Sequence, residues 1–397
     1  MQWVSESSDA PAFVDALERV ASALEAGLGG SPPDLVLAFV SPHHREHFDR
    51  LPEAVARRCG TPVVVGCSAG GVIGGAHERE RTPALALVGA MLPAVSVRPF
   101  HCGAGALRDR DPDAPSWTER VGLLPSETEA LLLMPEPFGC DVGELLHSLD
   151  VAYPDATKIG AVASGGTRPG EVALFATGAC VRDGAVGIAL GGNLVVDSLV
   201  AQGCRAVGEP MFVTRAQDNL ALQLDGRAAS RVLQDLYERS GPQDREAMRT
   251  ALFLGIVGEP GHERYGTGDF LVRNIVGLDA RTGGLAVAAR VRVGTVVQFH
   301  VRDAQASADD LRAHLQRHAA AGPRPSAVLS FSCLGRGIGL YGEPDFDLRC
   351  IREQLGDVPV GGFFGNGEIG PIAGVRAHTF MHGYTTALAL VRRRHVD

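Results

Sequence analysis

The sequence lacks the charge pattern of a protein that binds nucleic acid or an anionic membrane. Its 397 residues carry a formal net charge of -9, with 37 lysines and arginines against 46 acidic residues. The basic residues are scattered along the chain, whereas partners rich in phosphate need clustered cations. We therefore expect a small molecule or another protein as the partner, and no nucleic acid or membrane.

The cysteines lack any C-x-x-C pair and any regular spacing. The eight are Cys59, Cys67, Cys102, Cys140, Cys180, Cys204, Cys333 and Cys350. Scattered cysteines fit a reducing compartment better than a disulfide framework. The segment "HHREH" places His43 and His47 four residues apart, but it is not H-E-x-x-H and no third ligand is evident. It favours a solvated helix face, and we expect no metal site.

A targeting segment and a long apolar run are also missing. The N-terminal "MQWVSESSDA" has no basic region followed by an apolar stretch, and the apolar segment 84–97 is short and interrupted by Pro93. A membrane-spanning helix needs about 20 apolar residues. We expect a cytoplasmic protein that is neither secreted nor inserted in a membrane.

Glycine, by contrast, is abundant, with 50 residues, and two glycine motifs resemble those of enzymes. "GCSAG" (66–70) has the G-x-S-x-G spacing of a nucleophile elbow, and "GNGEIG" (365–370) has the G-x-G-x-x-G spacing of a dinucleotide-binding turn. Both chemistries require a helix directly after the motif. The segments that follow are broken by glycine or proline and lead into strands, so we expect no Ser68 hydrolase and no nucleotide or other cofactor.

A pattern of strand, helix, strand, glycine turn and further strands occurs three times. It begins at "DLVLAFV" (34–40), "EALLLMPEP" (129–137) and "SAVLSFS" (326–332). The intervals Leu35 to Gly66, Leu131 to Gly160 and Ala327 to Gly361 are each about thirty residues, the scale of one β-α-β unit.

This pattern predicts an α/β (α+β) fold with mixed β-sheets covered by helices, built from repeated β-α-β-β-β units in two intimately packed halves. The turns near Gly66, Gly160 and Gly361 should each join two strands. Their glycines either permit positive φ and tight turns, or line a pocket with exposed N–H groups, and the sequence leaves both interpretations open.

Four segments together resemble the FIST family, a sensory module named for its occurrence with F-boxes and in intracellular signal transduction. They are "VVVGCSAGGVIGG" (63–75), "LVRNIVGLDARTGGL" (271–285), "VLSFSCLGRG" (328–337) and "GGFFGNGEIGPI" (361–372). The likeness covers nearly the whole chain. It implies an N-terminal FIST-like domain over residues 1–212 and a C-terminal one over 213–397.

The resemblance also implies an intracellular sensory protein that binds a small ligand, with amino acids or related carboxylates as candidates. The glycine turns lack a complete catalytic constellation, so we expect this protein to be non-catalytic. This chain departs from the family in the first turn, where "GCSAGGVIGG" lacks the acidic residue that members often have after the glycine. No output domain follows Asp397, so we expect a stand-alone sensor that acts on a signalling protein in trans.

The candidate ligand site lies where two buried strands of the third unit end. Arg336 can present a planar fork to a carboxylate, and Glu368 can accept a ligand amine. Asn366 and Gly365 would add polar contacts. The alternative is that Arg336 pairs with Glu343 or Glu368 and only stabilises a loop.

Further candidates are Cys333, His382 and the first turn with Gly66, Cys67 and Ser68. Cys333 and His382 could equally be core residues, and Arg273 is a weaker candidate in a loop-strand segment. The rival function is a cysteine-dependent acyl transferase or hydrolase that uses Cys333 or Cys67 with a histidine such as His382. A thiol buried far from any base would argue against it.

Overall fold

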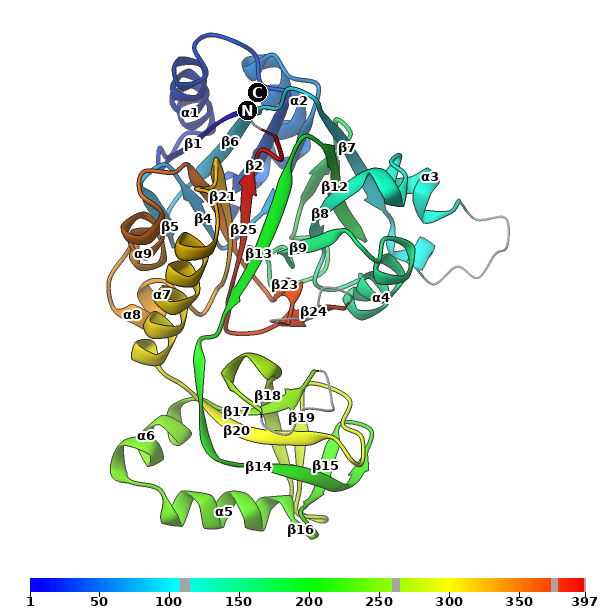
Figure 1. Cartoon of the computed structure of the whole chain (residues 1–397), viewed down its shortest axis with the longest axis vertical. Helices are drawn as coiled ribbons and strands as arrows, with labels where there is room; N and C mark the ends of the chain where they lie inside the picture. The colour runs from blue at the N-terminus through cyan, green and yellow to red at the C-terminus, as the bar shows by residue number, and fades with distance from the viewer. Residues whose placement is uncertain (108–114, 259–264, 373–377, 396–397) are drawn as a thin grey trace. The chain divides into compact units, whose positions relative to one another are not determined.

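The computed structural model describes residues 1–107, 115–258, 265–372 and 378–395. Its contacts divide the chain into two compact units, which we describe separately (Figure 1). Unit 1 contains residues 1–200, 311–381 and 385–397, and unit 2 contains residues 201–310 and 382–384. The domain boundary at 212/213 stays a prediction.

Unit 1 contains three sets of strands with the same pairing. In each set, a central strand pairs in parallel with one strand and antiparallel with another. The central strands are β2 (Leu35–Val40), β8 (Thr128–Pro135) and β21 (Ala327–Cys333); the parallel partners are β3 (Val64–Ser68), β9 (Thr157–Ala161) and β22 (Val360–Gly365); the antiparallel partners are β6 (Leu85–Met91), β12 (Ala185–Gly192) and β25 (Thr386–Arg392). The expected α/β fold with mixed sheets is confirmed.

Helices provide the crossover that a parallel pair of strands requires. They are η1 (Pro42–Arg50) with α2 (Leu51–Cys59) in the first set, α4 (Val142–Ala152) in the second and α9 (Phe346–Leu355) in the third. Gly60 ends α2 in the left-handed conformation, and the Asp141 carboxylate caps α4 by accepting the Glu144 N–H. Turn and cap residues therefore set the ends of these helices.

The three sets exchange strands in a cycle. The strand β4 (Gly71–Gly74) follows β3 but pairs with β22 of the third set. In the same way, β10 (Leu174–Ala176) follows β9 but pairs with β3, and β23 (Glu368–Pro371) follows β22 but pairs with β9. Strands, not helices, thus follow the two glycine motifs, as expected.

The glycines of the parallel pairs stand where neighbouring strands approach most closely. A Cβ atom at Gly66, Gly160 or Gly362 would lie only 1.8 to 2.0 Å from a carbonyl oxygen of the adjacent strand. No side chain fits at such a distance, so these three positions are structurally equivalent. The sequence pattern aligns Gly361 with Gly66 and Gly160. This alignment is wrong by one residue, because the equivalent position in the third set is Gly362.

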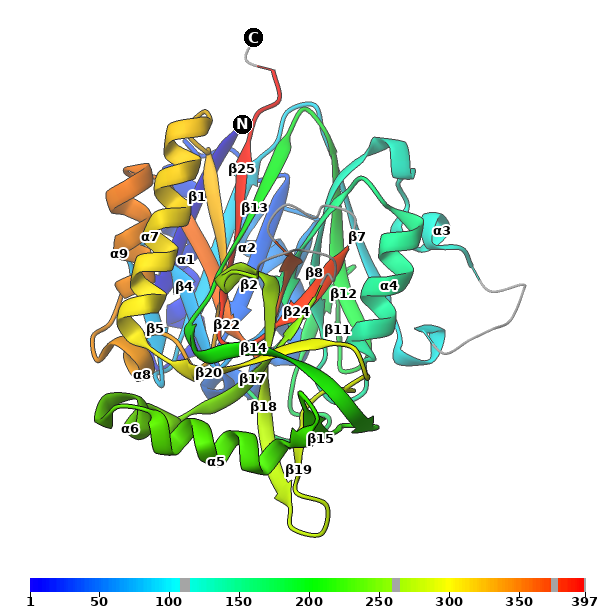
Figure 2. The same cartoon turned by 60° about the horizontal axis from the view of Figure 1, so that its bottom comes forward.

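The inner faces of the three sheets share one apolar core, in which the Phe39 and Phe363 rings lie 5.0 Å apart. The outer faces are covered by helices: α1 (Phe13–Gly27) and α2 on the first sheet and α4 on the second. Figures 1 and 2 show α9 beside the third sheet. Strands covered on both faces are apolar throughout, which explains runs such as 35–40.

The remaining elements of unit 1 extend these sheets or connect them. They are β1 (Gln2–Ser8), β5 (His77–Glu80), β7 (Val95–Cys102), β11 (Ala179–Val181), β13 (Val195–Ala201), β24 (Thr379–His382), α3 (Trp117–Val121), α8 (Ile338–Tyr341), η2 (Ala104–Leu107) and η3 (Pro125–Glu127). Among the residues that the structure describes, no helix is long and apolar enough to cross a membrane.

The described residues of unit 2 form an antiparallel sheet with helices and an apolar core of its own. The order of its strands is β14-β20-β17-β18-β19-β15-β16, and β14 also pairs with β15. Its elements are β14 (Cys204–Gln217), β15 (Leu220–Leu224), β16 (Arg227–Ala228), α5 (Ala229–Arg239), α6 (Pro242–Thr250), β17 (Leu252–Val257), η4 (Thr267–Asp269), β18 (Phe270–Asp279), β19 (Gly284–Val287) and β20 (Val296–Arg302). The helix α7 (Ala304–Ala321) begins in unit 2 and continues in unit 1.

Candidate functional site

The carboxyl ends of β3, β9 and β22 meet in unit 1. The backbone N–H of Ser164 donates to the carbonyl of Ser68 at 3.2 Å, and the N–H of Asn366 donates to the carbonyl of Val162 at 2.9 Å. The turns of the first and second sets, and of the second and third, are therefore joined directly.

The side chain of Ser164, in the second turn, adds a link to each of the other two turns. Its hydroxyl accepts the Gly70 N–H at 2.8 Å and donates to the carbonyl of Phe364 at 2.5 Å. The three turns are thus joined in one hydrogen-bonded cluster through the second turn, and we call this cluster the turn ring: residues 68–70, 162–164 and 364–366. Ser164 was not predicted from the sequence, because its role depends on a partner 200 residues away.

The first-turn candidates belong to this ring as structural groups. Gly66 is held against a neighbouring carbonyl, and the Ser68 hydroxyl donates to the Ser164 carbonyl and accepts the Ala173 N–H. Ser68 has no exposed surface. Burial also raises the pKa of the fully buried Cys67 thiol well above its ordinary value, which keeps it protonated.

Arg336 is buried and already bound to a carboxylate. Its Nε and Nη2 donate to Asp347 at 2.8 and 2.9 Å, and Nη2 also donates to the Tyr341 hydroxyl at 2.6 Å. Although burial lowers the pKa of the guanidinium, Asp347 more than offsets this effect. The alternative expectation, that Arg336 pairs with Glu343 or Glu368, is wrong. Glu343 pairs with Arg349, and the carboxylate that pairs with Arg336 is that of Asp347.

Glu368 lies in the same region and is completely buried. Its Oε2 accepts the backbone N–H of Thr385 at 3.1 Å and the hydroxyl of Thr385 at 2.8 Å, whereas Oε1 has no hydrogen-bond partner among the described residues. Burial raises the pKa of the carboxyl to about 8, and the hydrogen bonds from Thr385 and the charge of Arg336 oppose this rise only partly. Glu368 is therefore mainly a neutral acid at neutral pH.

A second buried acid reaches this cluster from β5. Glu78 accepts the Leu348 N–H at 2.8 Å, and burial together with the nearby Asp347 raises its pKa to about 8. Asp345 accepts the Glu78 N–H, and Glu80 accepts the Ile338 N–H. These contacts attach the β4–β5 hairpin to the segment that carries Arg336.

Cys333 ends β21 beside this cluster. Its Sγ accepts the Gly335 N–H at 3.5 Å, and its backbone N–H donates to the carbonyl of Thr385 at 3.0 Å. The structure thus brings Cys333 and Glu368 together at Thr385, and the Arg336 charge is close enough to lower the pKa of Glu368. His382 and Arg273 belong to unit 2, and His43 and His47 lie in the short η1 helix, where the His47 ring stacks on Phe13 at 4.7 Å.

Asn366 differs from the other candidates because its side chain is exposed. It lines a pocket of about 490 Å³, together with Val162, Met381 and the loop 137–143 that leads into α4. We call it the strand-end pocket, because it opens beyond the carboxyl ends of β8, β9 and β22. Crevices at that edge of an α/β sheet are common ligand sites, and the first N–H groups of α4 face no intrahelical acceptor.

Among residues 1–107, 115–258, 265–372 and 378–395, no group of three or more histidine, cysteine or acidic side chains is arranged to hold an ion. The cysteine that lines the strand-end pocket, Cys140, is a thiol, because burial raises its pKa to about 12. The pocket therefore offers hydrogen-bonding and apolar contacts to a ligand.

Comparisons with known proteins give a family for most of the chain. A FIST N domain model matches residues 34–227, and a FIST C domain model matches residues 228–371. An uncharacterized protein of Mycobacterium tuberculosis is 36% identical over 383 residues, which cover 94% of this chain and 95% of the relative. An uncharacterized protein of Mycobacterium bovis is 34% identical over 369 residues, covering 91% and 92%.

One solved structure, a cyanuric acid hydrolase, aligns with 99% of this chain and 100% of its own length. The TM-score is 0.30 and the sequence identity is 12%. A likeness at this level supports no conclusion about either fold or activity.

Proposed function

Because this chain belongs to the FIST family, we propose that it is a sensory protein that binds a small ligand, an amino acid or a related carboxylate, and passes the signal to a protein partner. The observation that carries the proposal is the strand-end pocket of about 490 Å³ beside the turn ring. Its volume falls within the range of small-molecule sites.

The polar groups of the pocket suit a ligand that carries both a carboxylate and an amine. Asn366 offers an amide, and the amino-terminal N–H groups of α4 favour negative charge, whereas the Asp141 carboxylate, which lines the pocket and caps α4, favours a ligand amine. Arg336 and Glu368 are buried in the neighbouring cluster and do not line the pocket. In this proposal the two residues support the turn that presents Asn366.

A thermal-shift screen of the common amino acids tests the proposal. A ligand that binds only the folded state stabilises it by about 2.7 kcal/mol at a hundredfold excess over Kd. The matched ligand control is the amide of each active amino acid, which lacks the carboxylate and should give little shift. Asn366→Leu should weaken the response without lowering the melting temperature of the free protein. A screen in which no carboxylate stabilises the protein would refute the proposal.

The rival function, a cysteine-dependent enzyme, now depends on Cys333. Cys67 is unsuited to attack because it is buried and protonated. The Gly335 N–H and the nearby Arg336 charge are groups that stabilise a thiolate. Selective alkylation of Cys333 by iodoacetamide at neutral pH would favour the enzyme, whereas alkylation no faster than that of a free thiol would remove this alternative.

A further inference from the structure

A second pocket in unit 1 shares no lining residue with the strand-end pocket. It has a volume of about 710 Å³. Its walls come from the start of β9 with the two residues before it, most of β13, the part of α7 in unit 1, the end of β23 with the next residue, and the start of β24. The lining residues are Asp155, Ala156, Thr157, Lys158, Val196, Asp197, Ser198, Leu199, Val200, His314, Arg317, Pro371, Ile372 and Thr379. We call it the β13–α7 pocket.

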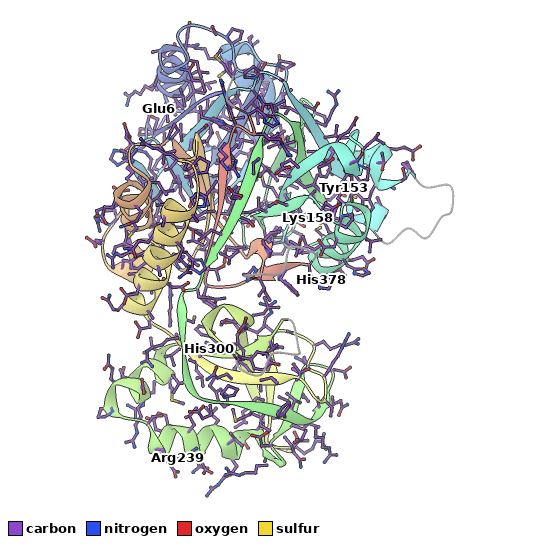
Figure 3. The ribbon with its side chains drawn as sticks, in the orientation of Figure 1. Glu6, Tyr153, Lys158, Arg239, His300 and His378 are labelled. Carbon is purple, nitrogen blue, oxygen red and sulfur yellow. The ribbon has the colours of Figure 1, made fainter. Side chains whose placement is uncertain are left out.

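Its wall contains Lys158, the single lysine among 397 residues; the other 36 basic residues of this count are arginines. The Lys158 side chain has no exposed surface. Its ammonium donates to Asp150 at 3.1 Å and to the Tyr153 carbonyl at 2.5 Å, between β9 and the end of α4 (Figure 3). Burial lowers the pKa of Lys158 even though Asp150 opposes the shift, so negative charge nearby would stabilise the ammonium.

The described wall also contains Asp197, Arg317 and Asp155, and the Asp155 charge, like that of Asp150, raises the pKa of Lys158. Asp197 is paired with Arg392 at 3.1 Å. Arg317 on α7 and Asp155 before β9 are both exposed at this pocket. A ligand with one carboxylate and one amine would match both, whereas a multiply charged anion would meet the Asp155 carboxylate.

The pocket is also built from the segments that connect the two units along the chain. Residues 196–200 directly precede the passage into unit 2 at 200/201, and His314 and Arg317 follow the return at 310/311 within the continuous helix α7. A ligand held here contacts both connections. The pocket is therefore placed where a bound ligand would restrict the segments through which unit 2 is attached.

We propose that the β13–α7 pocket is a second ligand site, which binds a free α-amino acid through Arg317 and Asp155 above the buried Lys158 and acts on unit 2 through β13 and α7. The inference shares its ligand class with the proposed function but names a different site. Its test must therefore separate the two pockets.

The single lysine provides a reporter inside the wall. Protein grown with ¹⁵N-lysine gives one lysine amide signal, which belongs to Lys158. We expect this signal to shift and saturate on titration with the amino acid that stabilises the protein, both in the natural protein and in Asn366→Leu. Thermal stabilisation without any shift of the lysine signal would overturn this inference and leave the proposed function standing. If neither response occurs with any amino acid, both fail.

Arg317→Glu should weaken the titration by about tenfold or more, because it places a carboxylate where the ligand carboxylate binds. The matched control is Arg19→Glu, an equally exposed arginine on α1 that lines neither pocket, and it should leave the affinity unchanged. Equal effects of the two variants would contradict a specific contact. A shift with inorganic phosphate but with no amino acid would overturn the ligand class.

Hydrogen exchange tests the action on unit 2. Bound amino acid should slow amide exchange in residues 196–202 and 304–317 and leave α1 unaffected. Saturation of the lysine signal with no slower exchange in either segment would refute the coupling through β13 and α7.

Discussion

Arg336 illustrates how an arginine at the end of a strand can be mistaken for a ligand contact. Its side chain is 1% exposed and forms a two-pronged ion pair with Asp347. The sequence indicated a cation at this turn, but the partner stands 11 residues further on, at the start of α9. A carboxylate in the first turn of a helix is common for reasons of the helix dipole alone, so nothing in the sequence singled out Asp347.

Arg336→Ala should destabilise unit 1 by about 3 to 5 kcal/mol, because the buried Asp347 carboxylate would lose its cation. Urea unfolding measures the change. Arg349→Ala removes a similar pair with Glu343, but an exposed one, and should cost at most about 1 kcal/mol. Equal losses in the two variants would show that the burial of Arg336 does not matter.

The buried Glu368 carboxyl should make stability depend on pH. Its pKa is 4.5 in a solvated chain and about 8 in the folded protein, so the folded state retains a proton that the unfolded state releases between these values. The stabilisation that the protonated Glu368 carboxyl contributes is fully present below pH 4.5 and is lost as the pH rises through about 8. Between these two values the free energy of unfolding falls by roughly 1.4 kcal/mol for each pH unit. Glu78 acts in the same direction.

Glu368→Gln keeps an acceptor for Thr385 without the titration, so its melting temperature should fall less than that of the natural protein as the pH rises from 4.5 to 8. Glu53→Gln, an exposed glutamate of α2, is the control and should follow the natural curve. Parallel curves for all three proteins would mean that Glu368 titrates normally.

At the scale of elements, the three β-α-β units were predictable and the links between them were not. Each unit is formed by one continuous segment of the chain, so its apolar strands, its glycines and the periodicity of its helix predict its structure. The exchange of β4, β10 and β23 depends on hydrogen bonds between distant segments. The sheet of unit 2 lies outside the repeat, and its exposed and buried residues alternate irregularly along β14, so no periodic signal marked it.

Gly66→Ala should cost more than about 3 kcal/mol, because the new Cβ would stand 1.8 Å from the Ala38 carbonyl in the centre of the first sheet. Gly277→Ala is the matched strand control, since no described atom lies within 4 Å of its Cβ position. Denaturant unfolding of the two variants measures the difference. A tolerated Gly66→Ala would indicate that the close strand approach relaxes easily.

At the scale of the whole molecule, most of unit 2 is one insertion in the chain of unit 1. Its first and last residues lie together: the Gln202 N–H donates to the Asp310 carboxylate at 2.7 Å, and the Asp303 N–H donates to the Gly203 carbonyl at 3.4 Å. Because the two ends of the inserted segment are adjacent, the chain of unit 1 can leave and return at nearly the same point without a change in its fold. The host, unit 1, contains the three strand sets, the turn ring and both candidate pockets.

A chain in which a short Gly-Ser linker joins Val200 to Leu311 should therefore keep the fold of unit 1. The apolar core and the turn ring involve no residue of the deleted segment, and the sheets of unit 1 lose only Ala201, the last residue of β13. The deletion also shortens α7 to residues 311–321, and residues 382–384 lose the unit with which they are grouped. Well-dispersed amide signals and cooperative thermal unfolding would support this expectation. Residues 201–310, produced alone, should fold on their own apolar core. An unfolded shortened chain would instead show that unit 1 depends on unit 2, as expected of two halves in extensive contact.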